Sequence, residues 1–196
     1  MTQKNLIIVF TKPLERGKVK KRIAEVIGSI KALELYKMLL NKTLATIERS
    51  GFPLQFYLTE IMDSETLTEF KLQDGKNLGE RMSKAIAEEL RNGNQVCLIG
   101  GDCLDIDSSD LKEAFDNLKI NDLVIGPSYD GGYYLIGMKK HYPELFTSIQ
   151  WSTATVFEET LKIAQRLNLS IHILPQRLDI DHVEDIPKNW LNKLNN

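Results

Sequence analysis

Two carboxylates follow an apolar run near the middle of the chain and could bind a divalent metal. The apolar run covers residues 96–99, two glycines come next, and Asp102 and Asp105 follow them. This pattern predicts a buried strand whose carboxyl end delivers the acidic side chains to the edge where open α/β sheets bind their ligands. Paired carboxylates suit Mg²⁺ or Mn²⁺, which in turn bind phosphate oxygens. Alternatively, Asp102 only caps the helix that follows.

A basic loop near the start of the chain could bind phosphate groups. The apolar run at 6–10 predicts a central strand that is buried on both faces, and a glycine-containing cluster of lysines and an arginine follows at 17–22. Lysine and arginine side chains supply positive charge, and arginine can bind a phosphate through two hydrogen bonds. Alternatively, the loop is basic and solvent-exposed without binding a ligand, as most clusters of charged residues are.

Arg81 is a weaker candidate for ligand binding. It lies in the first turn of a helix that the spacing of Met82, Ile86 and Leu90 predicts. The helix dipole disfavours a cation in this turn unless an anion is near, so Arg81 could contact an anionic ligand. An ion pair with Glu80 or with Glu88 would explain the residue equally well.

Two more acidic groups occur later in the chain. Asp130 begins an Asp-Gly-Gly turn between two apolar runs, which predicts a hairpin and therefore one antiparallel strand in the sheet. The turn could be purely structural, or Asp130 and its neighbouring tyrosines could face a substrate. Asp179 and Asp181 lie close enough to repel each other unless a cation or hydrogen bonds relieve them, so they could bind a metal. Their alternative role is to cap the start of the last helix.

The elements between these residues alternate between strands and helices. We expect a three-layer α/β sandwich with a mixed, mostly parallel sheet, forming one domain over residues 1–196. Ser108 or Ser109 should cap one helix, and Ser152 or Thr155 another, with Thr155 and Glu158 forming a capping box. The predicted strands cover 6–10, 53–58, 96–99, 122–127, 133–138 and 169–174, and the predicted helices cover about 30–47, 64–70, 82–90, 108–118, 155–167 and the residues around Trp190.

The composition narrows the function classes. The chain has 25 Lys and Arg against 27 Asp and Glu, a net charge of −2, so no basic field points to a nucleic acid partner. No stretch resembles a signal peptide or a membrane span, so we expect no membrane partner. Cys97 and Cys103 are too few for a disulfide framework, which favours a cytoplasmic protein. The three histidines show no zinc spacing.

Several ordered motifs resemble a bacterial family of small glycosyltransferase-like proteins. The motifs are Thr11-Lys12-Pro13 followed by Gly17-Lys18-Val19-Lys20-x-Arg22, Leu78-Gly79-x-Arg81-Met82, Gly100-x-Asp102-Cys103, Gly126-Pro127-x-x-Asp130-Gly131-Gly132-Tyr133, Trp151-Ser152-Thr153, and Asp179-Ile180-Asp181-x-x-x-Asp185. Members are nucleotide-diphospho-sugar transferases associated with arsenosugar-type biosynthesis, and the family is similar to the molybdenum cofactor guanylyltransferases and to phospholactate guanylyltransferase. Lys21, Gly101, Leu104 and His182 depart from the usual family residues.

The resemblance implies a GT-A fold and a set of site residues. It implies a nucleotide-sugar or an NTP as one substrate, a small-molecule acceptor as the other, and Mg²⁺ or Mn²⁺ as the cofactor. Glycosyl transfer is the first hypothesis, nucleotidyl transfer with release of pyrophosphate is the second, and a non-catalytic nucleotide-binding protein is the third. The residues implied for catalysis are Asp102, Asp130 and Asp181, and those implied for the metal are Asp102 and Asp181, less surely Asp179. The residues implied for nucleotide binding are Thr11, Lys12, Gly17, Lys20, Arg22, Leu78, Gly79 and Arg81. The residues implied on the acceptor side are Gly131, Gly132, Tyr133 and Trp151.

Overall fold

A computed structural model of the chain describes residues 4–61 and 69–195. The strands are β1 (Lys4–Thr11), β2 (Leu54–Leu58), β3 (Phe70–Leu72), β4 (Asn94–Gly100), β5 (Leu123–Pro127), β6 (Tyr133–Met138) and β7 (Ile171–Ile173). The helices are α1 (Lys21–Ile27), α2 (Ser29–Ser50), α3 (Leu78–Arg91), α4 (Ser108–Leu118), α5 (Val156–Arg166) and α6 (Lys188–Asn195), with short 3₁₀ turns η1 (Pro143–Phe146) and η2 (Val183–Asp185).

The seven strands form one sheet in the order β3-β2-β1-β4-β6-β5-β7. β6 runs antiparallel to its neighbours β4 and β5, whereas every other pair is parallel. The apolar runs that predicted β1 and β4 lie side by side at the centre of the sheet, with Ile7 opposite Cys97 and Val9 opposite Ile99. The predicted mixed, mostly parallel sheet is therefore confirmed, including the antiparallel strand after the Asp-Gly-Gly turn.

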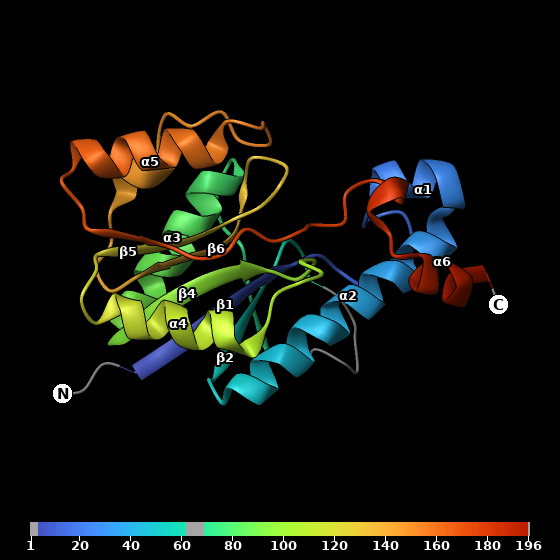
Figure 1. Ribbon diagram of the computed structural model, residues 1–196, viewed down its shortest axis with the longest axis horizontal. Helices are drawn as coiled ribbons and strands as arrows, with labels where there is room; N and C mark the ends of the chain where they lie inside the picture. Colours follow the sequence, from blue (N-terminus) through green and yellow to red (C-terminus); the bar gives the residue numbers. More distant parts are fainter. Residues whose placement is uncertain (1–3, 62–68, 196) are drawn as a thin grey trace.

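Helices cover both faces of the sheet, and the alternation along β1 explains the apolar run at 6–10 within that strand. Ile8 and Phe10 belong to a core cluster that contains residues of α3 and α5. Ile7 and Val9 belong to a second cluster, on the other face, with residues of α2 and α4. Successive side chains of a strand point to opposite faces, so a strand buried on both faces needs apolar residues at every position. Figure 1 shows the resulting three layers, with α3 and α5 on one side of the sheet and α4 and α2 on the other.

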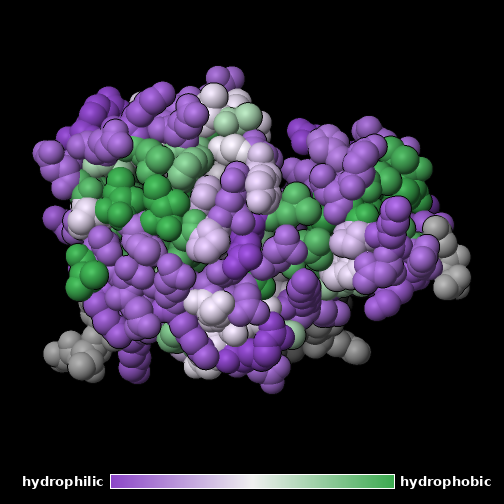
Figure 2. Space-filling model, in the orientation of Figure 1, coloured by the Kyte–Doolittle hydropathy of each residue, from purple (hydrophilic) through white to green (hydrophobic). Residues whose placement is uncertain are grey.

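A small helical lobe extends from the sheet and forms a third cluster of buried residues. Figure 1 shows α1 and α6 together at one end of the long helix α2. Ile23 of α1 and Leu35 of α2 pack there with Leu104 and Ile180, which come from the loop after β4 and from the segment after β7. The lobe therefore holds the C-terminal segment against the loop that follows β4. On the face drawn in Figure 2, most side chains are hydrophilic, and apolar groups gather on both the sheet body and the lobe.

The helix caps differ from the prediction. The N-cap of α4 is Asp107, whose carboxylate accepts from the Ser109 amide at 2.9 Å, and Asp110 accepts from the Asp107 amide at 2.9 Å. Two carboxylates thus satisfy the free amides that Ser108 or Ser109 was expected to satisfy, and they also complement the helix dipole. At α5, the Thr155 hydroxyl donates to Glu159 at 2.9 Å and makes no cap hydrogen bond, so the predicted capping box with Glu158 is wrong.

The bounds of most predicted elements shift by a few residues, and two predicted elements differ more. Most of the predicted helix at 64–70 lies outside the described residues, and its last residue, Phe70, begins strand β3 instead. The predicted strand at 169–174 is shortened to β7. Among the described residues, no helix has the length and apolar character that crossing a membrane requires.

Candidate functional site

The two glycines after β4 make room for the Asp102 carboxylate. The Gly101 amide donates to the Phe10 carbonyl at 3.1 Å, which holds the end of β4 against the end of β1. A Cβ atom at Gly100 would lie 2.9 Å from Oδ1 of Asp102, and one at Gly101 would lie 3.1 Å from Leu40. Larger residues would push against the carboxylate or the core, so this turn favours glycine. Asp102 therefore lies at the carboxyl end of the central strand, as the sequence predicts.

Lys20 joins Asp102 to Asp181 across the sheet edge. The Lys20 ammonium lies 2.8 Å from Oδ2 of Asp102 and 3.2 Å from Oδ1 of Asp181. The Lys20 side chain is 5% exposed, whereas the two carboxylates are 37% and 41% exposed. Arg22 lies farther out, with its guanidinium 3.9 Å from Asp181. The structure thus brings together four predicted site residues, but Lys20 contacts carboxylates where the resemblance implied a contact with phosphates.

Electrostatics favour the charged forms of Lys20 and Asp102. Burial raises the pKa of Asp102, but the charge of Lys20 and its hydrogen bond outweigh burial and hold that pKa below its ordinary value. Burial lowers the pKa of Lys20, but Asp102 and Asp181 outweigh it and raise that pKa overall. An ammonium shared by two carboxylates is a charge-assisted contact, which is stronger than a neutral hydrogen bond.

Asp179 is a buried carboxyl next to this cluster. Burial, followed by the negative charges of Asp102 and Asp130, raises the pKa of Asp179 to about 7. Its Oδ1 atom is buried and has no hydrogen-bond partner among the described residues. Asp179 forms a β-bridge with Cys103, which places the segment after β7 alongside the loop after β4. Asp105 is exposed, so the second carboxylate that contacts Lys20 is Asp181 and not the nearby Asp105 that the spacing suggested.

The Asp-Gly-Gly turn is held closed by Asp130. Its carboxylate accepts from the Gly132 amide at 3.0 Å and from the Ser128 hydroxyl. Gly131 has φ +86°, and a Cβ atom there would lie 2.0 Å from the Ala154 carbonyl oxygen, so only glycine fits. Asp130 therefore has a structural role in the turn. Its negative charge also contributes to the raised pKa of Asp179.

The start of α3 and Trp151 meet at Gly79. A Cβ atom at Gly79 would lie 2.3 Å from the indole nitrogen of Trp151, so the ring rests directly on the glycine. Tyr133 contacts the same indole edge-on, with the ring centroids 6.4 Å apart. This contact joins the predicted nucleotide residues Leu78 and Gly79 to the predicted acceptor residues Tyr133 and Trp151.

Arg81 holds its own loop. Its Nε donates to the Gly75 carbonyl at 3.1 Å, which is neither the ligand contact nor the pairing with Glu80 or Glu88 that the sequence suggested. Gly75 has φ +150°, and the backbone amide of Arg81 would lie 2.7 Å from a Cβ atom there. Arg81 therefore helps to fix the loop before α3.

Two residues that the sequence analysis did not single out for the site position its first loop. The Tyr36 hydroxyl lies 2.7 Å from the Thr11 hydroxyl and accepts from the Lys12 amide at 3.1 Å. Gln73 donates to the Thr11 carbonyl at 3.2 Å and to the Tyr57 carbonyl at 2.9 Å. Helical spacing marked Tyr36 only as a core residue, and its hydroxyl, a group that needs a partner when buried, was the missed signal.

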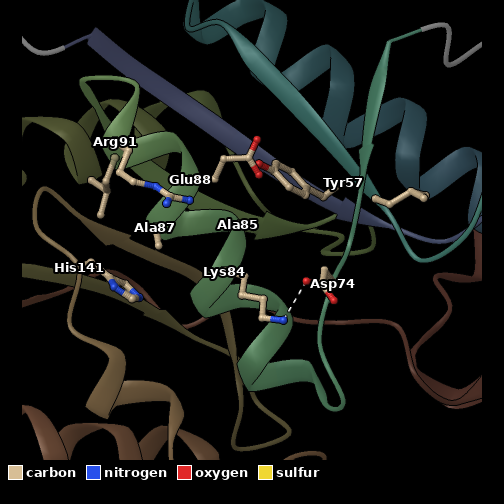
Figure 3. A pocket seen from close by; sticks show the side chains of 10 residues that line it. Tyr57, Asp74, Lys84, Ala85, Ala87, Glu88, Arg91 and His141 are labelled. Atoms are coloured by element: carbon tan, nitrogen blue, oxygen red, sulfur yellow. Dashed lines mark hydrogen bonds and ion pairs between the residues drawn. The ribbon is translucent and has the colours of Figure 1, made fainter.

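A surface hollow lies away from this site. It has a volume of about 600 Å³ and runs along α3, where Lys84 pairs with Asp74 at 2.8 Å (Figure 3). Glu88, Arg91 and His141 also line it. None of the predicted catalytic, metal or nucleotide residues lines this hollow, so it supports none of the predicted roles.

The residues at the end of β4 fit a divalent cation of the magnesium type. Within residues 4–61 and 69–195, no three His, Cys, Asp or Glu side chains form a ready-made metal cluster. Two carboxylates do converge on one cation, the Lys20 ammonium, and Asp179 leaves one buried oxygen without a partner beside them. Mg²⁺ typically needs only one or two protein carboxylates because water and substrate phosphates supply the remaining ligands.

Comparison with known proteins identifies the family of this chain. The family described as "Uncharacterized protein conserved in bacteria (DUF2064)" matches residues 54–153, more than half of the chain. A crystal structure from Desulfovibrio desulfuricans G20, described as a candidate nucleotide-diphospho-sugar transferase, is 33% identical and has a TM-score of 0.87. The match covers 94% of this chain and 85% of that one. The chain belongs to the DUF2064 family. The matched residues contain Asp102 and Asp130, whereas Lys20 and Asp181 lie outside them.

More distant structures share the fold of this DUF2064 protein. The inositol-1-phosphate CTP transferase from T. maritima is 15% identical with a TM-score of 0.58, and the match covers 98% of this chain and 95% of that one. Rv0371C from Mycobacterium tuberculosis H37Rv, solved as a complex with manganese, is 13% identical with a TM-score of 0.57, covering 99% and 98%. No curated protein matches the chain. These likenesses confirm the expected GT-A-like fold, and the relative that is 33% identical supports an enzyme of the transferase class.

Proposed function

We propose that this DUF2064 protein transfers a glycosyl group from a nucleotide-diphospho-sugar to a small-molecule acceptor. The observation that carries the proposal is the convergence of Asp102, Asp181 and Lys20 at the carboxyl end of β4, where an α/β sheet binds its ligands. The relative from Desulfovibrio desulfuricans supports a donor of this class. We further propose Mg²⁺ or Mn²⁺ as cofactor and the cytoplasm as location, since both cysteines are free and buried.

The proposed reaction exchanges one bond for another at the anomeric carbon of the donor sugar. An acceptor oxygen bonds to that carbon while the bond from the carbon to the β-phosphate oxygen breaks. The nucleoside diphosphate leaves with the bonding electron pair, and the acceptor proton passes to a base. A bound divalent cation would neutralise charge that develops on the leaving phosphate.

We assign each step of the proposed reaction to residues near the end of β4. Asp102 and Asp181 would hold the cation, because their carboxylates already share one cation in Lys20. Thr11, Lys12 and Arg22 would contact the phosphates from the first loop, which Tyr36 holds in place. Asp179, whose pKa burial and neighbouring carboxylates raise, would accept the acceptor proton. Tyr133 and Trp151 would contact the acceptor or the sugar.

A second candidate is nucleotidyl transfer. Here a phosphate oxygen of the acceptor would attack the α-phosphorus of an NTP, and the bond to the β-phosphate would break to release pyrophosphate. The basic cluster around Lys18 and Lys21 favours this reaction because a triphosphate carries more negative charge than a diphosphate-sugar. A third candidate is a non-catalytic nucleotide-binding protein, which the departures from the family residues at Lys21, Leu104 and His182 keep open.

Product analysis distinguishes these candidates. The protein is incubated with Mg²⁺ or Mn²⁺ and with nucleotide-diphospho-sugars or NTPs, in the presence of simple sugars and sugar phosphates, and the nucleotide products are separated by chromatography. We expect release of a nucleoside diphosphate from one nucleotide-sugar by the wild type and by Asp105→Ala, and none by Asp102→Ala. Release of pyrophosphate from an NTP would establish the second candidate instead. Binding of a nucleotide without turnover across the panel would favour the third.

A further inference from the structure

Lys20 already occupies the place of a cation between the two proposed metal ligands. Its ammonium touches both carboxylates, at 2.8 and 3.2 Å, and the side chain is almost fully buried beneath them. The carboxylates are more than a third exposed, so a metal would approach them from the solvent side. A divalent ion on these carboxylates would therefore lie within a few ångströms of a buried positive charge, and that repulsion is poorly screened.

The backbone at Lys20 is also unusual. Lys20 has φ 43° and ψ 51°, a left-handed conformation that few residues other than glycine adopt, at the N-cap of α1. A lysine makes no side-chain cap hydrogen bond there, so capping does not explain the residue. Its ion pairs with Asp102 and Asp181 are the contacts that explain a lysine in this strained position.

We propose that Lys20 is the resident cation of the Asp102–Asp181 pair and competes with a divalent metal for it. The inference rests on the proposed function, because it takes the two carboxylates as metal ligands. Without a nucleotide, the lysine keeps the carboxylates together and weakens metal binding. When the metal arrives with the phosphates of a donor, those phosphates give the ammonium a new anionic partner. The site thus binds the metal together with the nucleotide and binds the free ion poorly.

Metal titration without nucleotide tests this competition. The binding of Mn²⁺ to the wild type, Lys20→Met and Lys21→Met is followed by the electron paramagnetic resonance signal of free Mn²⁺. We expect Lys20→Met to bind Mn²⁺ about tenfold more tightly than the wild type, within the usual range for coupled sites. Lys21→Met is the matched control because it removes the same charge from an adjacent, exposed side chain, and its affinity should change less than twofold.

Repeating the titration in an Asp102→Asn variant tests whether Lys20 acts through the two carboxylates. In Asp102→Asn, Lys20 keeps only its contact with Asp181, so adding Lys20→Met should strengthen Mn²⁺ binding less than it does in the wild type. An equal gain in both backgrounds would mean that Lys20 acts through the general charge of the surface, and it would overturn the proposal. Mn²⁺ binding by Lys20→Met that equals or is weaker than that of the wild type would overturn it as well.

The proposal can still be tested if Lys20→Met does not fold. Lys20→Gly removes the ammonium and accepts the left-handed backbone without strain. If either variant is unfolded without metal and folds when Mn²⁺ is added, the metal has taken the place of the lysine, which supports the proposal. A variant that stays unfolded in Mn²⁺ contradicts it. Because no nucleotide is present, these results are independent of the product analysis that tests the proposed transfer reaction.

Discussion

Asp181 contacts the Lys20 ammonium at 3.2 Å although 161 positions separate the two residues in the chain. The contact forms because the segment after β7 returns along the sheet, with a β-bridge between Asp179 and Cys103, and then packs Ile180 into the helical lobe. The C-terminal segment therefore completes a cluster whose other members, Lys20, Arg22 and Asp102, lie much earlier in the chain.

Asp185 positions Asp181 through the backbone. Its carboxylate accepts from the Asp181 amide at 3.0 Å and from the His182 amide at 2.7 Å. We expect Asp185→Leu to weaken Mn²⁺–nucleotide binding about tenfold, because the Asp181 backbone loses its anchor, a cost near that of one charged hydrogen bond. Asp185→Asn keeps an acceptor oxygen and should bind within about threefold of the wild type. Equal binding by Asp185→Leu and the wild type, measured by calorimetry, would contradict this role.

Gly79 and Trp151 should show strong coupling in stability. Gly79→Ala places a methyl group where the indole lies, so the variant should lose about 1–3 kcal/mol of unfolding free energy. In a Trp151→Ala background the ring is absent, and the same substitution should cost almost nothing or stabilise α3, since alanine favours helices. Urea unfolding of the four proteins measures the coupling. Equal costs in the two backgrounds would mean that the ring does not rest on the glycine in solution.

Tyr36 should affect nucleotide binding as well as stability. Tyr36→Phe removes the partner of the Thr11 hydroxyl and of the Lys12 amide, which should cost about 1–3 kcal/mol of unfolding free energy. Tyr134→Phe is a matched control, because Tyr134 is also buried and its hydroxyl donates to the Pro175 carbonyl at 3.1 Å. Both variants should be destabilised, but only Tyr36→Phe should bind the nucleotide more weakly. Equal nucleotide affinity in the two variants would remove Tyr36 from the site.

Arg177 and Asp110 form a buried ion pair that fixes the segment leading to Asp179. The guanidinium makes two contacts to the Asp110 carboxylate, at 2.7 and 3.0 Å, and the carboxylate is only 3% exposed. Arg177→Met leaves that buried charge unpaired and should cost about 3–5 kcal/mol of unfolding free energy. Adding Asp110→Asn should recover part of this loss.

An exposed pair provides the comparison. Lys119 and Asp116 lie 2.7 Å apart but are mostly exposed, so Lys119→Met should change the unfolding free energy by less than about 1 kcal/mol. Thermal or urea unfolding measures both changes. A similarly small change for Arg177→Met would show that the Arg177–Asp110 pair is broken in solution.

Much of the fold could be predicted because its signals are local. The apolar runs at 6–10 in β1 and 96–99 in β4 indicate strands buried on both faces, and an Asp-Gly-Gly turn indicates a hairpin. Helix caps were less predictable, because several neighbouring polar residues can each satisfy the same free amides. At α4, Asp107 does so in place of the serines that follow it.

The contacts among the candidate site residues could not be predicted from the sequence. Spacing and resemblance singled out Lys20, Asp102 and Asp181, yet nothing local in the sequence indicates that the lysine neutralises the two carboxylates. The contact depends on the return of the chain after β7 and on the left-handed backbone at Lys20, and both arise from tertiary packing. Tyr36 and Gln73 were missed for the same reason, since their partners lie far away in the sequence.

The most direct test of the account is a thermal-shift measurement on the wild type, Asp102→Ala and the control Asp105→Ala. Each protein is heated with nucleoside diphosphates, NTPs and nucleotide-diphospho-sugars, with Mg²⁺ or Mn²⁺ and with a chelator. A ligand at about 100 times its Kd adds about 2.7 kcal/mol to the stability of the folded state, which is readily detected. The account predicts a metal-dependent shift with one nucleoside diphosphate and its sugar, kept in Asp105→Ala and lost in Asp102→Ala. Full metal-dependent nucleotide binding by Asp102→Ala would contradict it.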